Sequence, residues 1–296
     1  MHRRVLLTGP LAMTALAPVR GWAAGIGTVA SFSILADMVR RIGGDLVNVV
    51  SLVPVDADAH TYQPTASDSR ALTSAALLVE NGLGLEGWMA RLGTASSFRG
   101  VRVIATTGVI PRTMREGTET SIDPHAWQNP RNGVIYARNI AEGLAQASPG
   151  QAEFWRAKAA AYINEIEQAD AWIAAQFDPI PPAARRIITT HDAFGYYGDR
   201  YGVSFLAAEG ISTDSEPSAK GIAALVGQVR REKVRTVFLE NMTDPRLTKM
   251  LARETGASLS GPLYSDALSK PGGPAADYLT MLRYNTKLFV RAMRQD

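Results

Sequence analysis

Apolar and polar residues follow two alternating patterns along the chain. From Gly27 onward, short runs of β-branched and other apolar residues are followed by longer segments in which apolar side chains return every three to four positions. Such short runs are typical of buried strands and the longer segments of amphipathic helices. In the first half of the chain, strands are predicted at 28–32, 47–52, 76–79 and 101–104, and helices at 34–42, 67–73, 85–92 and 133–147.

The same alternation returns in the second half. Here strands are predicted at 186–190, 204–207, 236–239 and 258–263, and helices at 193–201, 219–232, 245–254 and 275–293. Strands that alternate with helices are typical of α/β units with parallel pairing. We therefore expect an α/β protein with two α/β lobes, each built on a parallel-type sheet.

A long segment rich in alanine, glutamate and glutamine separates the two halves. Residues 150–177 contain no internal glycine or proline, and a proline-rich stretch follows them. A continuous helix of this length would extend about 40 Å, the width of a small domain. A long surface helix would show the same pattern, but the position favours a single helix that joins the lobes. The expected organisation is a leader at 1–24, an N-terminal lobe at 25–148, a connecting helix at 149–178 and a C-terminal lobe at 179–296.

The first 24 residues have the features of an export signal. Two adjacent arginines precede an apolar stretch at 5–19, and small residues follow it, so we expect cleavage near Ala23 or Ala24. The apolar stretch is short for a membrane anchor and contains two prolines. The paired arginines leave the twin-arginine route open beside the general secretory route. The chain has no cysteine for a disulfide or a lipid anchor, so we expect a soluble, monomeric periplasmic protein.

The net charge of +3 comes from the leader. Of the 31 basic residues, three arginines lie in residues 1–24, which contain no acidic residue, so 28 basic side chains remain against 28 acidic ones. No basic run or stripe stands out in the rest of the chain. Nucleic-acid binding is therefore not expected.

Three histidines outside the leader occupy similar positions. His60 lies in a polar loop after a predicted strand, His125 in a loop before a helix, and His191 directly after a strand. Asp266 follows the last predicted strand. Because ligands of open α/β sheets bind beyond the carboxyl ends of the strands, we expect these four residues to converge in the cleft between the lobes.

Three imidazoles and one carboxylate form a ligand set that suits zinc. Nitrogen donors favour zinc, copper, nickel or iron, whereas manganese prefers sites richer in carboxylate. A ligating imidazole usually donates its second N–H to a carboxylate or carbonyl group. The candidates for this role are Asp56, Asp58, Asp123 and Glu240, although helix capping or loop solubility explains Asp56 equally well.

Around these residues the sequence resembles the metal-binding solute-binding proteins of ABC importers, the cluster A-I type. The first family motif, Asp-Pro-His-x-Tyr/Phe-Glu-Pro, corresponds to Asp-Ala-His-Thr-Tyr-Gln-Pro at 58–64. The second, Asp-Pro-His-x-Trp, is matched in full at 123–127, and the third, Thr-His-x-Ala-Phe-x-Tyr, at 190–196. Asp266 corresponds to the aspartate that follows the last strand of the family.

The resemblance implies a periplasmic protein that captures a divalent transition metal and delivers it to an ABC permease in the inner membrane. It also implies the same four ligands and one rigid helix between the lobes. Histidine at the position of His191 goes more often with zinc, and glutamate there with manganese or iron. The chain departs from the family at Ala59 and Gln63, and residues 112–121 lack the histidines that many zinc-specific members carry in this region.

Two other functions compete with metal transport. Residues 82–87 fit the Gly-x-Gly-x-x-Gly pattern of dinucleotide sites, but the acidic residue expected at the end of the next strand is missing, so a tight turn explains them better. A periplasmic zinc hydrolase would keep three protein ligands and an open position for water. That alternative depends on Asp266 standing away from the metal, where it could act as a general base. A binding protein without enzymatic activity is the favoured interpretation.

Overall fold

The computed structural model describes residues 25–116, 119–207, 210, 213, 219–232 and 234–294. The predicted leader and its cleavage site lie outside these residues. Among the helices of the described residues, none is long and apolar enough to cross a membrane.

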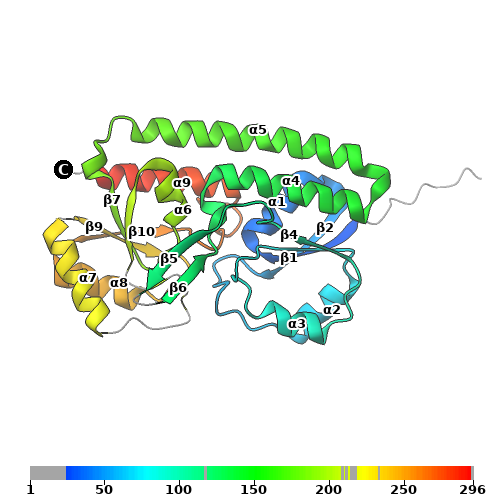
Figure 1. Ribbon diagram of the computed structural model, residues 1–296, viewed down its shortest axis with the longest axis horizontal. Coiled ribbons are helices and arrows are strands. Elements are labelled where there is room, and N and C mark those ends of the chain that lie inside the picture. Colours follow the sequence, from blue (N-terminus) through cyan, green and yellow to red (C-terminus); the bar gives the residue numbers. More distant parts are fainter. Residues whose placement is uncertain are drawn as a thin grey trace, which may run out of the picture.

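The first lobe is built on a four-stranded parallel sheet with the order β2-β1-β3-β4. Its strands are β1 (Ile26–Phe32), β2 (Val47–Val53), β3 (Leu77–Glu80) and β4 (Val101–Ile104). Its helices are α1 (Ser33–Gly43), the short η1 (Gly44–Leu46), α2 (Ala66–Ser74), α3 (Met89–Ala95) and α4 (Pro130–Ala147). Helices α1 and α4 cover one face of the sheet, and α2 and α3 cover the other (Figure 1).

The second lobe repeats this arrangement with a parallel sheet in the order β10-β9-β7-β8. Its strands are β7 (Arg186–Thr189), β8 (Ser204–Ala207), β9 (Thr236–Glu240) and β10 (Ser258–Leu263). Its helices are η4 (Pro182–Ala184), α6 (Gly195–Tyr201), α7 (Ala219–Glu232), α8 (Pro245–Thr255) and α9 (Tyr278–Met293). The two lobes with parallel sheets confirm the predicted fold class.

Helix α5 (Ala152–Phe177), preceded by the single turn η3 (Pro149–Gln151), links the lobes. It runs along the length of the molecule and lies over both lobes (Figure 1). The buried residues of this helix recur every three to four positions and form one stripe: Trp155, Ala159, Tyr162, Ile166, Ala169, Ile173 and Phe177. This stripe packs against α4 and α9, so α5 is held along its length by both lobes.

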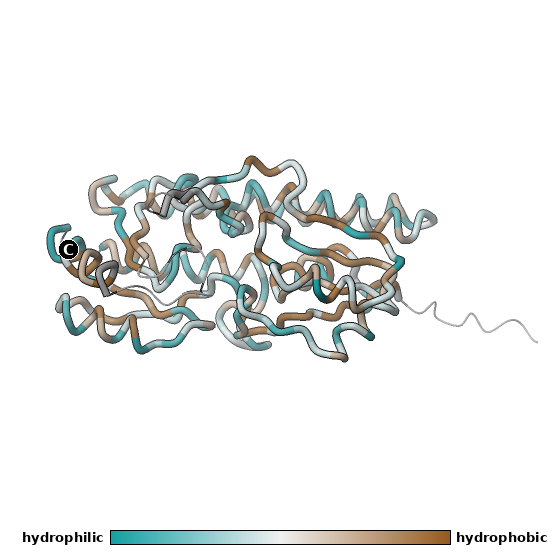
Figure 2. Tube along the Cα trace, turned by 60° about the horizontal axis from the view of Figure 1, so that its bottom comes forward, coloured by the Kyte–Doolittle hydropathy of each residue, from teal (hydrophilic) through white to brown (hydrophobic). Residues whose placement is uncertain are grey.

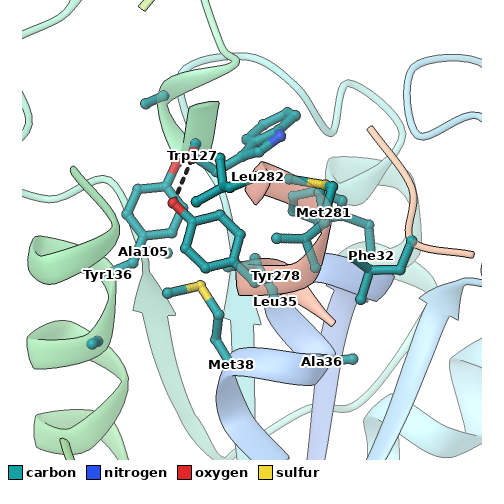
Figure 3. Packing of buried hydrophobic residues seen from close by; sticks show 14 of the residues in the cluster. Phe32, Leu35, Ala36, Met38, Ala105, Trp127, Tyr136, Tyr278, Met281 and Leu282 are labelled. Atoms are coloured by element: carbon teal, nitrogen blue, oxygen red, sulfur yellow. Dashed lines mark hydrogen bonds between the residues drawn. The ribbon is translucent and has the colours of Figure 1, made fainter. Parts of the chain in front are cut away.

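The two lobes share one main hydrophobic core. In Figure 3, Tyr278, Met281 and Leu282 of α9 lie among Phe32 and Trp127 of the first lobe. The Tyr278 hydroxyl donates to the carbonyl oxygen of Trp127 at 2.6 Å. Hydrophobic residues concentrate along the strands, while the outer helices alternate between polar and apolar positions (Figure 2). A smaller core of five buried residues lies in the second lobe: Ile188, Leu225, Val229, Val237 and Leu251.

The structure differs from the sequence-based expectation in two places. Strands β5 (Arg112–Glu116) and β6 (Glu119–Asp123) form an antiparallel hairpin that the hydrophobic pattern did not predict. The predicted helix at 85–92 was misplaced, since α3 begins only at Met89. Gly82, Leu83 and Gly84 all have positive φ, so the chain turns here before it can form a helix.

Candidate metal centre

Strand ends and the loops that follow them position the four predicted ligands. His60 lies in the loop after β2, His125 follows β6 with one residue between, His191 lies shortly after β7, and Asp266 shortly after β10. One ligand atom from each residue lies within 4.8 Å of the ligand atoms of the other three. Residues far apart in the sequence and from both lobes therefore meet at one point.

The spacing of these atoms suits a single ion. Nε2 of His60 lies 3.1 Å from Nε2 of His125 and 3.3 Å from Oδ2 of Asp266. Nε2 of His191 lies 3.1 Å from the same carboxylate oxygen. Four donors bonded to one tetrahedral zinc ion at about 2.0–2.1 Å would be about 3.3 Å apart. The arrangement can accept an ion with only small adjustments of the side chains.

The cluster is almost completely shielded from solvent. The side chains of His125, His191 and Asp266 are 0% exposed, and that of His60 is 5% exposed. Three of the predicted ligands thus lie in the interior, and His60 lies on the side nearest to solvent. A buried carboxylate needs a compensating positive charge, which a divalent cation or protonated imidazoles can supply.

Two carboxylates hold the outer nitrogens of two imidazoles. Oδ1 of Asp123 lies 2.8 Å from Nδ1 of His125 and also accepts the backbone N–H of His125 at 3.0 Å. Oε2 of Glu240 lies 2.6 Å from Nδ1 of His191, a close ionic contact whose direction does not satisfy hydrogen-bond geometry. Both contacts turn Nε2 toward the centre of the cluster, which is the usual role of such partners in metal sites.

The aspartates of the first ligand loop have other roles. Asp58 accepts the backbone N–H of His60 at 2.8 Å and the hydroxyl of Thr213 at 2.6 Å. Asp56 accepts the side-chain N–H of Asn241 at 3.0 Å. None of these three hydrogen bonds involves the ring of His60. Asp56 and Asp58 therefore join this loop to the second lobe and do not orient the imidazole directly.

The cluster binds protons strongly in the absence of a metal. Burial opposes the charged form of His125, but the carboxylates of Asp266 and Asp123 outweigh this effect and raise its pKa to about 9. Burial likewise opposes charge on His191, where Glu240 and Asp266 raise the pKa well above the usual value. Burial disfavours ionised Asp266, but the two histidines hold its pKa well below the usual range. A metal ion must displace these protons to bind.

Glu240, the last residue of β9, connects two of the predicted ligands. It is buried, and Oε1 accepts the backbone N–H groups of Thr190 and His191 at 2.9 and 3.1 Å. Its Oε2 accepts the hydroxyl of Ser265 at 2.6 Å, next to Asp266 in the sequence. One carboxylate therefore fixes the backbone on both sides of the site within the second lobe.

Two residues shortly after His125 hold the lobes together and were not identified from the sequence. Nε1 of Trp127 and Nε2 of Gln128 donate to the same carbonyl oxygen of Ser265 at 2.9 and 2.7 Å. All three residues are buried. The motif at 123–127 marked Trp127 as notable, but the partner lies too far along the chain for the sequence pattern to indicate it.

Comparisons with known proteins match nearly the whole chain. The family model described as "Zinc-uptake complex component A periplasmic" matches residues 28–292. The iron-binding protein YfeA of Yersinia pestis is 31% identical over 269 residues, which are 90% of this chain and 86% of that protein. The manganese ABC transporter substrate-binding lipoprotein PsaA of Streptococcus mitis is 30% identical over 264 residues, 87% of this chain and 85% of that protein.

The fold also matches solved structures. The manganese-bound periplasmic metal-binding protein from Candidatus Liberibacter asiaticus superimposes with a TM-score of 0.81. It is 30% identical, and the match covers 90% of this chain and 98% of that one. All three proteins are named for metal binding, and PsaA is named as the substrate-binding component of an ABC transporter.

Proposed function

Because the chain belongs to the family of periplasmic zinc-uptake components, the metal-binding solute-binding proteins of ABC importers, we propose that it captures zinc in the periplasm and delivers it to an inner-membrane permease. The proposed ligands are His60, His125, His191 and Asp266. The observation that carries this proposal is the convergence of three histidine nitrogens and one buried carboxylate within 4.8 Å.

The choice of zinc rests on the chemistry of this donor set. Three neutral imidazoles and one carboxylate satisfy a four-coordinate zinc ion, whereas manganese prefers more oxygen donors. Manganese or iron is the second candidate, because the relatives reported above are named for those metals. Zinc and manganese differ enough in ligand preference for one experiment to separate them.

A hydrolase is disfavoured by the position of Asp266. Its Oδ2 lies 3.1 Å from Nε2 of His191 and 3.3 Å from Nε2 of His60, where it would fill the fourth coordination position. A catalytic zinc ion needs that position for water. We therefore propose a carrier that binds its cargo and releases it unchanged.

The proposed protein consists of a removable leader, two lobes and a connecting helix. A leader at 1–24 would be removed near Ala23 or Ala24, leaving a soluble periplasmic monomer with lobes at 25–148 and 179–296 and a connecting helix at 149–178. The relatives include proteins named as lipoproteins, whereas this chain has no cysteine to which a lipid could be attached. The proposal of a soluble protein rests on that difference.

Metal analysis of the protein purified from the periplasm tests the function. We expect one equivalent of bound metal, and competition titrations should show tighter binding of zinc than of manganese. The variant His191→Ala should bind zinc much more weakly. Tighter binding of manganese would move the assignment to the second candidate, and less than half an equivalent of any metal would contradict the site itself.

A further inference from the structure

Arg112, the first residue of β5, joins the hairpin to the second lobe beside the metal site. Its backbone N–H donates to the hydroxyl of Tyr196 at 2.8 Å. Its guanidinium contacts two carboxylates, with Nη1 at 3.2 Å from Oδ2 of Asp123 and Nε at 3.1 Å from Oδ2 of Asp199. Tyr196 and Asp199 belong to α6. Arg112 therefore lies between helix α6 and the carboxylate that supports His125.

The two oxygens of Asp123 have different partners. Oδ1 faces the Nδ1 atom and the backbone N–H of His125, while Oδ2 faces Arg112. The Asp123 side chain is 0% exposed, so these protein groups and not solvent hold its two oxygens. A buried carboxylate that loses its charged partner on one oxygen is no longer held in place on that side and can reorient. The orientation of the His125 ring thus depends on the contact between Oδ2 of Asp123 and Arg112.

Helix α6 leaves space for the ion pair of Arg112 and Asp123 because its first residue has no side chain. Gly195 is the first residue of α6, and a Cβ atom placed on it would lie 2.3 Å from Nη1 of Arg112 and 2.6 Å from Oδ2 of Asp123. Both distances are far below van der Waals contact, so a side chain at this position would displace the guanidinium. The close packing fixes the pair from the side of the second lobe.

We propose that Arg112 is a positioning residue for metal binding, which acts through Asp123 to hold the His125 ring with Nε2 toward the ion. This inference rests on the proposed function. The arginine fork suits the task because it can hold two carboxylates in one plane, which a lysine cannot do. Arg112 thus supports the site from outside the set of proposed ligands.

The test compares Arg112→Met with Arg200→Met in the full chain, with zinc affinity measured by chelator competition. Arg200 is the matched control because its side chain is 23% exposed, against 26% for Arg112, and because it also pairs with a carboxylate of another element, that of Asp170 on α5. We expect Arg112→Met to weaken zinc binding about tenfold, the lower end of the range for residues behind metal ligands. Arg200→Met should stay within about twofold of the wild type.

A double-mutant cycle and a spectroscopic probe separate positioning from general damage. If Arg112 acts through Asp123, Arg112→Met should cause no further loss in an Asp123→Asn background. The visible spectrum of bound cobalt(II) should change in Arg112→Met and stay the same in Arg200→Met. Fully additive losses, or equal losses in the two arginine variants, would overturn the inference.

The variant Gly195→Ala keeps the inference testable if Arg112→Met does not fold. It leaves both charges in place, but the added Cβ would separate the guanidinium from the Asp123 carboxylate by displacing one or both of them, so a loss of zinc affinity is expected. Unchanged affinity in a folded Gly195→Ala protein would overturn the inference. A wild-type protein that binds neither zinc nor cobalt would instead contradict the proposed function.

Discussion

Glu240 shows how one side chain can set the properties of the proposed site. It contacts Nδ1 of His191 and fixes the backbone next to Asp266 through Ser265. Residues of this kind usually change metal affinity by about 10–100-fold when they are altered, although they do not touch the ion.

Replacement of this carboxylate gives the first prediction. Glu240→Gln should weaken zinc binding by about 10–100-fold, because a neutral amide stabilises the imidazole of His191 less than a carboxylate does and its NH2 group cannot accept the hydrogen bonds that Glu240 accepts. Glu80→Gln is a matched control: both residues end a strand of a parallel sheet, and both are 4% exposed. Competition titrations should show near wild-type affinity for the control. Near wild-type affinity in Glu240→Gln would mean that Glu240 has no part in metal binding, and an equal loss in both variants would assign the effect to general damage.

The second prediction concerns protons. In the metal-free protein His125 has a pKa of about 9, so it is protonated at pH 7 and must lose its proton when a metal binds. Zinc affinity should therefore fall as the pH falls, by about tenfold per pH unit for each proton released. Calorimetry in buffers of different ionisation enthalpy measures this number directly. Binding without net proton release at pH 7 would contradict the predicted protonation of His125 in the metal-free protein.

The four residues that form the cluster could be selected from the sequence because each lies in a short, local motif. His125 and Asp123 are two positions apart, so their contact is also a local feature. The contacts of Trp127 and Gln128 with Ser265 join residues more than a hundred positions apart, and no local pattern indicates such pairs.

At the scale of elements, α9 begins where it meets α1. Asp37 of α1 accepts the backbone N–H of Tyr278, the first residue of α9, at 3.0 Å. Burial raises the pKa of Asp37 to about 6, although this hydrogen bond favours the charged form. The folded protein therefore binds a proton at Asp37 more tightly than the unfolded chain does, and stability is lost as the pH rises from about 4 through 6.

The third prediction follows from the raised pKa of Asp37. Asp37→Asn keeps an acceptor for Tyr278 but carries no charge, so it should raise the free energy of unfolding at pH 7.5 by about 1–2 kcal/mol. At pH 4 the gain should disappear, because Asp37 is then protonated in the wild type. Urea unfolding at both pH values provides the measurement. The same gain at both pH values would assign the effect to packing and not to charge.

Most elements were predicted correctly because their buried faces repeat at the period of a strand or a helix. The hairpin of β5 and β6 escaped prediction because its strands are polar and charged, and it belongs to neither main sheet. The start of α3 was misplaced because backbone conformation at Gly82 and Gly84, and not hydrophobicity, determines it.

At the scale of the whole molecule, the shared core and α5 constrain relative motion of the lobes. Buried contacts cross from Trp127 and Gln128 to Ser265, and α5 packs on helices of both lobes. Packed interfaces of this kind move by small shifts and do not open freely.

The fourth prediction is a small change in lobe separation when metal binds. The chain has no cysteine, so Thr94→Cys and Arg253→Cys introduce unique spin-label positions on exposed residues of the two lobes. The distance between the labels should change by less than about 2 Å upon addition of zinc. A shift of the kind seen in hinge closure, well above that value, would show that the shared core does not hold the lobes.

The position of α9 also has a consequence for the order of folding. This helix is the last element of the described chain, yet Tyr278, Met281 and Leu282 complete the core of the first lobe (Figure 3). The N-terminal half cannot complete its core until the C-terminal end has been synthesised, so folding depends in part on contacts of very long sequence separation, which form slowly. Under the proposed export, this delay would suit the general secretory route, because a polypeptide that folds late remains unfolded while it crosses the membrane.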